Sequence, residues 1–173
     1  MTMEYTLIAV VIIILLYIYF YNKLISAKQN AHEAWSGIDV QLKRRHELIP
    51  NLVNVVQGYA KHEEKLFIQI TEERAKALSL PKSDIKGLSG IEKEIDTSLH
   101  SILAIAEAYP DLKANENFLN LQSQLAETED QIASARRIYN SNAADYNILI
   151  NSFPVNITAG LSNFSQLPYF QHN

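Results

Sequence analysis

The sequence contains no cysteine. Disulfide bonds, thiolate zinc sites, thiol nucleophiles and lipoprotein-type acylation are therefore excluded. Glycine and proline are also scarce, with five residues of each in a chain of 173. Because these two residues mark turns and interrupt helices, their scarcity favours long helices. We therefore predict an all-α fold.

The motifs of common enzyme classes are missing as well. The chain has no GxGxxG, Walker-type loop or GxSxG elbow. Three His-Glu pairs are present, but a zinc-protease motif needs a second histidine four residues after the first. That position holds Ser36, Pro50 or Leu66. No glutamate precedes a histidine by three residues, the spacing that di-iron bundles use. We therefore predict a non-enzymatic protein with no metal and no cofactor.

Charge is unevenly distributed along the chain. Between residues 22 and 61 six Lys or Arg residues face three acids, whereas from His62 onward nine basic residues face fifteen acidic ones. A basic segment beside an acidic body is typical of a domain that stands on an anionic lipid surface. Nucleic acid requires a broadly basic surface, so we expect no nucleic-acid partner.

The longest apolar run lies near the N-terminus. From Tyr5 to Tyr21 no residue is charged, and a helix of this length rises ~25 Å, close to the thickness of a bilayer core. A buried core helix and a cleaved signal peptide are the alternatives, but the start MTME carries an acid and no Lys or Arg, which disfavours a signal peptide. We predict a short external N-terminus and a transmembrane helix over residues 1–23. Its predicted membrane-interface side chains are Tyr5, Tyr17, Tyr19, Tyr21 and Lys23.

Basic residues indicate the orientation of this helix. Lys23 and Lys28 directly follow the apolar run, and more cations stand at residues 43–45, whereas no Lys or Arg precedes the run. The positive-inside rule then places the N-terminus outside and the rest of the chain in the cytoplasm. We predict a single-pass protein of a bacterial plasma (inner) membrane.

Apolar residues after the run recur every seven residues. The series begin at Trp35, Leu88 and Phe118 and indicate three amphipathic segments that bury narrow stripes against one another. We predict an antiparallel helical bundle over residues 24–153. The side chains predicted to be buried are Trp35, Ile38, Leu42, Leu52, Val56, Phe118, Leu125, Ile132, Tyr139 and Tyr146.

Pro50 leaves the number of bundle helices open. As an interior residue it would kink one long helix and give a bundle of three, and the heptad phase passes through it unbroken. As the first residue of a new helix it would split the segment and give four. One helix from Asn22 to Ser79 would be ~85 Å long, more than the other segments cover, so we narrowly favour the split.

The turn between the first two segments falls at residues 78–90, LSLPKSDIKGLSG. Within it, Ser89 and Glu92 have the spacing of a capping box, in which each side chain satisfies a free backbone N–H of the other. We therefore predict that the second segment starts at Ser89.

Two clusters of basic side chains form the candidate site. We predict that they contact an anion or a partner, and they comprise Lys43, Arg44, Arg45, Arg136 and Arg137. Arg45 falls on a core-facing heptad position, and a buried arginine needs a carboxylate. The candidate carboxylates are Asp39, Glu73, Glu127, Glu129 and Asp130. Either an internal ion-pair network fixes the bundle register, or the cations line a groove for anionic headgroups or a partner's tail.

The C-terminal tail, residues 154–173, is too apolar to be disordered. It folds back over the bundle, packs on a neighbouring subunit, or touches the bilayer.

Several long blocks together resemble one known family. They are AWSGIDVQLKRRHELIPNLVNVVQGYAKHE at residues 34–63, AYPDLKANENFLNLQSQLAETED at 108–130, IASARRIYNSNAADYN at 132–147 and FPVNI at 153–157. In this order, and over nearly the whole chain, the sequence resembles the LemA family. The resemblance implies a helical bundle behind one membrane helix with its N-terminus outside. No reaction is established for the family, whose members are associated with magnetosome membranes and with membrane-protein quality control beside HtpX-type metalloproteases.

Two functions are consistent with these observations. The first is a scaffold that self-associates as a homo-oligomer at the cytoplasmic face of the membrane, indicated by narrow apolar stripes on segments of unequal length and by the apolar tail. The alternative is an adaptor for a membrane metalloprotease of the HtpX type, which only the resemblance suggests.

Overall fold

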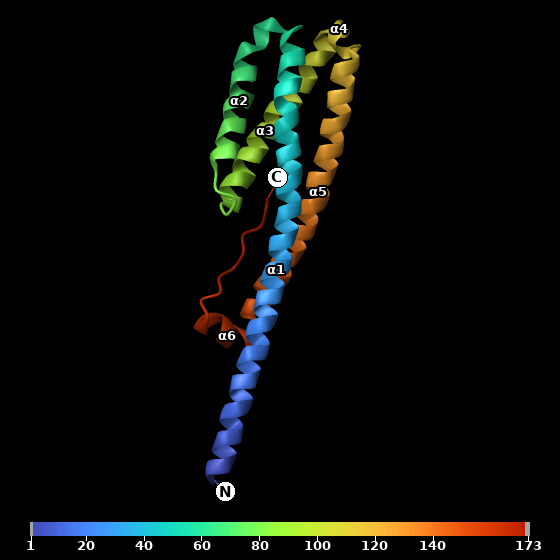
Figure 1. The fold of residues 1–173 in the computed structure, drawn as a ribbon. Helices are drawn as coiled ribbons and strands as arrows, with labels where there is room; N and C mark the ends of the chain where they lie inside the picture. The colour runs from blue at the N-terminus through green and yellow to red at the C-terminus, as the bar shows by residue number, and fades with distance from the viewer. Residues whose placement is uncertain (1, 172–173) are drawn as a thin grey trace.

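The computed structural model describes residues 2–171, which form helices and no strand. One long helix, α1 (Thr2–Gln57), runs the whole height of the molecule (Figure 1). Its 56 residues make a rod of ~84 Å. The other elements are η1 (Lys61–Glu63), α2 (Glu64–Ser79), α3 (Ile85–Ile105), η2 (Ala106–Ala108), α4 (Pro110–Lys113), α5 (Glu116–Asn151) and α6 (Val155–Leu161).

The N-terminal part of α1 is not covered by the rest of the chain. Its most apolar 18-residue window has a mean hydropathy of 2.3 and is 0% buried. Within the described residues, α1 is the one helix long and apolar enough to cross a membrane. The predicted interfacial side chains are all exposed: Tyr5, Tyr17, Tyr19, Tyr21 and Lys23.

Pro50 lies inside α1, which continues unbroken to Gln57. The favoured split at Pro50 is therefore wrong. Proline has no N–H to donate to the carbonyl four residues earlier, that of His46. In the structure Arg74 Nε of α2 donates to this carbonyl at 2.7 Å. Because another helix satisfies the freed carbonyl, α1 tolerates the proline.

The first segment instead ends at Gln57, and the chain turns at Gly58 and Tyr59. Tyr59 N and Ala60 N both donate to Val56 O, at 3.0 and 2.9 Å, and α2 then runs back along α1. The bundle of the described residues therefore combines α1, α2, α3 and α5. Figure 1 shows α5 beside the part of α1 that follows the apolar run, with α2 and α3 packed as a hairpin on the upper half.

The heptad stripes predicted the core correctly. Trp35, Ile38, Leu42, Leu52, Val56, Phe118, Leu125, Ile132, Tyr139 and Tyr146 are all buried. The core divides along the bundle axis into an upper cluster around Leu52, a middle cluster around Trp35 and a lower cluster around Leu24.

The start of α3 differs from the prediction. Asp84 is its N-cap, and Asp84 Oδ1 accepts a hydrogen bond from Gly87 N at 2.9 Å. The predicted capping box of Ser89 and Glu92 is wrong because this aspartate caps the chain into a helix about one turn earlier. Ser89 and Glu92 therefore lie inside α3, where both are buried.

The tail folds back along α5. Asn147 Nδ2 donates to Leu167 O at 2.9 Å, and Leu167 N donates to Asn147 Oδ1 at 2.8 Å. Asn140 forms the same two-way pair with Phe170, at 3.0 and 2.9 Å. The Phe170 ring is fully buried and meets the Trp35 ring edge-on. The tail thus covers the lower half of the bundle, and its last residues reach the start of α3 (Figure 1).

Candidate functional site

Arg45 is the largest fully buried side chain of the described residues. It projects from α1 and bonds to Glu92 and Asp96 of α3 and to Glu129 of α5, whose Oε2 lies 2.9 Å from Arg45 Nη1. Glu92 is fully buried, whereas the Glu129 side chain is 45% exposed. We call these four residues the Arg45 cluster. One cation therefore joins three helices near the middle of the bundle.

His46 extends the Arg45 cluster, and its Nε2 lies 2.9 Å from Glu92 Oε1. Burial raises the pKa of Glu92, but the hydrogen bonds and charges of His46 and Arg45 outweigh burial and lower the pKa below its usual value. Burial likewise disfavours the charged form of Arg45, yet the three carboxylates together raise its pKa. Both groups are therefore ionised at neutral pH.

The Arg45 cluster joins α1 to α3 and α5 through one buried cation. We expect this cation to fix one register of the helices, since a shift would leave a charge unpaired. A cavity of about 330 Å³ borders the cluster at Arg45, Asp96 and Glu129. Its other lining residues are both apolar and polar: Leu99, His100, Leu103, Gln122, Leu125, Ala126 and Asp130. In the part of the chain that the structure describes, no group of three His, Asp or Glu residues has the arrangement of a metal site.

The predicted basic residues occupy two separate places. Beside buried Arg45, Lys43 is exposed and Arg44 Nη2 bonds Glu127 Oε2 at 2.9 Å on the surface. Arg136 is half-buried and Arg137 is exposed on α5. Arg136 follows Glu127 by nine residues, or ~14 Å along the helix. The two clusters are thus apart along the bundle, and an anion or partner contact by either one stays a prediction.

Sequence reasoning found one of the three carboxylates that pair with Arg45. Glu129 was among the expected partners, whereas Glu92 and Asp96 were not. Among the other expected partners, Asp39 bonds Lys82, Glu127 bonds Arg44, Glu73 accepts from Gln69 at 2.8 Å, and Asp130 is exposed.

A signal for Glu92 was present in the heptad series. Glu92 stands four residues after Leu88 and three before Ile95, so it shares their face of α3. An acid on that apolar face indicates a buried partner of opposite charge.

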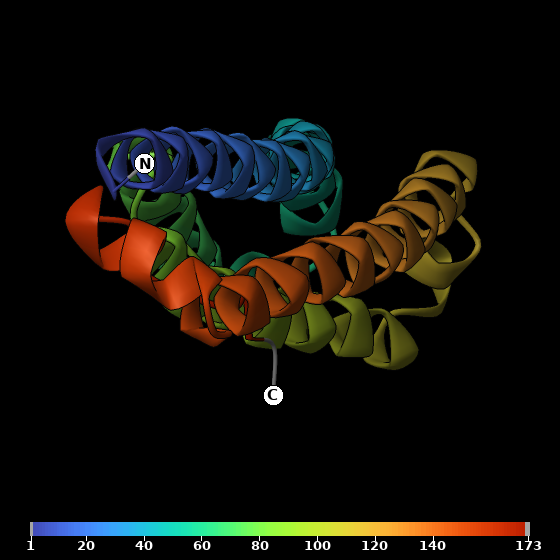
Figure 2. The ribbon, with the colours of Figure 1, turned by 90° about the horizontal axis from the view of Figure 1, so that it is seen from below.

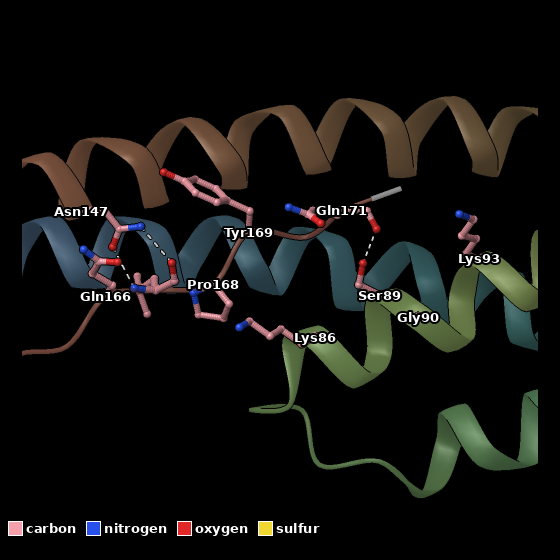
Figure 3. A pocket seen from close by; sticks show the side chains of 10 residues that line it. Lys86, Ser89, Gly90, Lys93, Asn147, Gln166, Pro168, Tyr169 and Gln171 are labelled. Carbon is pink, nitrogen blue, oxygen red and sulfur yellow. Dashed lines mark hydrogen bonds between the residues drawn. The ribbon is translucent and has the colours of Figure 1, made fainter. Parts of the chain in front are cut away.

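A polar groove of about 890 Å³ lies between α3 and the tail. Figure 3 shows Lys86, Ser89 and Lys93 on one wall, with Asn147 and the stretch from Gln166 to Gln171 on the other. Ser89 Oγ donates to Gln171 O, which joins α3 to the tail at one point. Two exposed lysines and several side-chain amides suit a polar occupant. None of these side chains was predicted as a site.

An apolar helix that the chain leaves uncovered, continuous with a bundle closed by its own tail, defines a membrane-anchored helical-bundle protein. The model of the LemA family matches residues 34–173. The chain belongs to the LemA family, as its sequence blocks predicted. The match begins beyond the apolar part of α1.

Three relatives illustrate the similarity. The chain is 26% identical over 175 residues to magnetosome protein MamQ 1 of Paramagnetospirillum magneticum, and 25% identical over 174 residues to magnetosome protein MamQ of Magnetospirillum gryphiswaldense. Each match covers 87% of this chain and 64% of the relative. The chain is also 28% identical over 152 residues to protein LemA of Metamycoplasma hominis, covering 87% of this chain and 68% of that protein. The chain therefore spans less than two thirds of the length of the magnetosome proteins.

Proposed function

We propose that this protein is a non-enzymatic helical scaffold that self-associates at the cytoplasmic face of a bacterial plasma membrane. The continuity of α1 carries the proposal. Its apolar start is exposed to the surroundings, and the same helix continues ~50 Å beyond Lys23 into the bundle without a break. An anchor and a bundle that share one helix form one rigid unit. Lys23 and Lys28 favour an external N-terminus.

The interior of the bundle supports a structural role over a catalytic one. The guanidinium of Arg45 is bonded by carboxylates of the same chain, so this buried charge serves to fix helices. Self-association is supported by exposed apolar side chains on the two longest helices, such as Val40 of α1 and Ile138 of α5.

The experiment uses single cysteines, because the natural chain has none. Val40→Cys and Ile138→Cys are each treated with a short bis-maleimide in native membranes, with Ile68→Cys on α2 as the matched exposed control. We expect an adduct of two chains at residue 40 or 138 in clear excess over residue 68. In parallel, the mass of the detergent-solubilised protein should be a multiple of 19.6 kDa.

A monomeric mass without adducts of two chains would contradict the scaffold. If the adducts instead contained a membrane metalloprotease of the HtpX type in fixed proportion, the adaptor function would replace it. Cross-linked adducts of varied mass at all three positions would indicate non-specific contact and would also count against self-association.

A further inference from the structure

The end of the chain combines an absence of charge with exposed apolar side chains. No Asp, Glu, Lys or Arg occurs from Tyr146 to Gln171. This stretch includes the last turn of α5, α6 and the tail. Phe153, Leu161 and Ile157 in or beside α6 are 81%, 71% and 56% exposed. We call these three side chains the α6 face.

The chain itself fixes the height of α6 along α1. Tyr17 OH and Ser162 Oγ share a hydrogen bond of 2.8 Å, and the Tyr21 and Phe164 rings meet edge-on at 5.8 Å. Tyr17 precedes Lys23 by six residues, or ~9 Å. Figures 1 and 2 show α6 beside α1 at the lower end of the bundle, next to the end of α5. The helix therefore lies level with the last turns of the apolar run.

The opposite side of α6 is buried in the bundle. Val155 and Ala159 are buried in the lower core cluster with Leu24. The α6 face points away from this cluster into the surroundings. Burial of apolar surface is favourable, so this face gains free energy from any apolar phase at its height.

We propose that the α6 face is a second membrane contact, seated in the interfacial layer of the leaflet from which α1 emerges. The occupant is lipid because the face is level with the apolar run of α1, where the bilayer is the first apolar phase that it meets. Lys28 Nζ lies 5.8 Å above the Phe164 ring, and Lys23 is close to it in sequence. Both cations stand where anionic headgroups would be.

A second membrane contact restricts motions of the bundle that a single transmembrane helix leaves free. A single transmembrane helix leaves the bundle free to rotate about the helix axis and to tilt. A short amphipathic helix lying in the interface plane beside it removes both freedoms. The bundle then presents one fixed side along the membrane. The proposal rests on the membrane anchor of the proposed function but not on self-association.

The test measures lipid contact in the full chain. Ile157→Cys carries an environment-sensitive dye in vesicles of phosphatidylcholine and phosphatidylglycerol that contain a nitroxide high on the acyl chain. Leu78→Cys, an exposed apolar position on α2, is the matched control, and Leu15→Cys reports the span. Circular dichroism and a melting curve show that each labelled chain is folded. We expect several-fold stronger quenching at residue 157 than at residue 78.

The other outcomes distinguish failure of the second membrane contact from failure of the membrane anchor. Quenching at residue 15 but not at residue 157 would overturn the second contact and leave the anchor intact. Absence of quenching at both residues would overturn the anchor and the second contact together. Energy transfer between dyes at residue 157 on separate chains, without quenching by the nitroxide, would assign the face to a second copy of the chain and overturn the lipid contact.

Discussion

The upper and lower halves of the bundle stabilise the same helix pair, α1 and α5, by different means. The upper half buries the Arg45 cluster, with charges from three helices. The lower half uses Asn140 and Asn147, whose neutral amides pair with the backbone of the tail. The lower half is also next to the apolar run of α1. Because unpaired ions are costly near hydrocarbon and paired amides are not, this division of interactions suits a bundle that stands on a bilayer.

The largest effect is expected from Arg45→Met. The change leaves Glu92 and Asp96 buried without their cation, and removing one partner of a buried ion pair costs ~3–5 kcal/mol. Chemical denaturation of the solubilised chain measures the loss. Arg44→Met removes a partly exposed pair with Glu127 and should cost ~1 kcal/mol or less. Equal losses in the two variants would contradict the difference in burial.

The same variant separates stability from anion binding. If Arg45 bound lipid headgroups, Arg45→Met would leave the melting temperature unchanged and weaken binding to anionic liposomes. That binding would also fall with salt, because exposed charges are screened beyond about 8–10 Å at physiological ionic strength. We expect a lower melting temperature and unchanged liposome binding.

In the lower half, Asn147→Ala should release the tail. The change leaves the partly buried Leu167 N and Leu167 O without their partners, and each lost hydrogen bond costs ~1 kcal/mol. Hydrogen exchange should speed up at the Leu167 amide and stay unchanged at core amides near Arg45. Asn54→Ala on the exposed side of α1 is the control, with an expected change within ~0.5 kcal/mol. Faster exchange in both halves would show that they unfold together and would break the comparison.

A smaller loss of folding stability is expected at acidic pH, where protonation of Glu92 weakens the Arg45 cluster in the upper half. Burial raises the pKa of Glu92, but His46 and Arg45 reverse this, so the folded-state pKa lies below its usual value. The unfolded chain, with a Glu pKa of about 4.3, then binds the proton more tightly. This stabilisation is complete above about pH 4.3 and is lost as the pH falls through the folded-state pKa.

The loss should be smaller than in Arg45→Met because protonated Glu92 still accepts a hydrogen bond from Arg45. Denaturation midpoints between neutral pH and pH 3, for the natural chain and for Glu92→Gln, measure it. The variant should show a shallower acid dependence. The same dependence in both proteins would assign the acid effect to other carboxylates.

The fold was predictable where short-range periodicity determines it. The heptad stripes located the buried residues from Trp35 to Tyr146, because burial of an apolar stripe repeats with the helix period. The apolar run, the helical class and the family resemblance were equally visible. These features depend on composition and spacing within one segment.

Features that join distant segments were not predictable in the same way. The continuity of α1 through Pro50 depends on Arg74, which lies 24 residues further along the chain. The choice of Glu92 as a partner of Arg45 depends on how α3 packs, and α3 starts earlier because Asp84 caps it. The pairing of Asn147 with the tail similarly has no local signature. Each of these interactions is decided by tertiary packing.

The orientation of α1 is tested most directly by chemical labelling in intact cells. Met3→Cys and Ser83→Cys are compared, each in the otherwise cysteine-free chain, with a maleimide that does not cross the membrane. We expect reaction at residue 3, and reaction at residue 83 only after the cells are permeabilised, because the proposed orientation places the N-terminus outside and the bundle in the cytoplasm. Reaction at residue 83 and protection of residue 3 in intact cells would contradict the orientation and the cytoplasmic scaffold that depends on it.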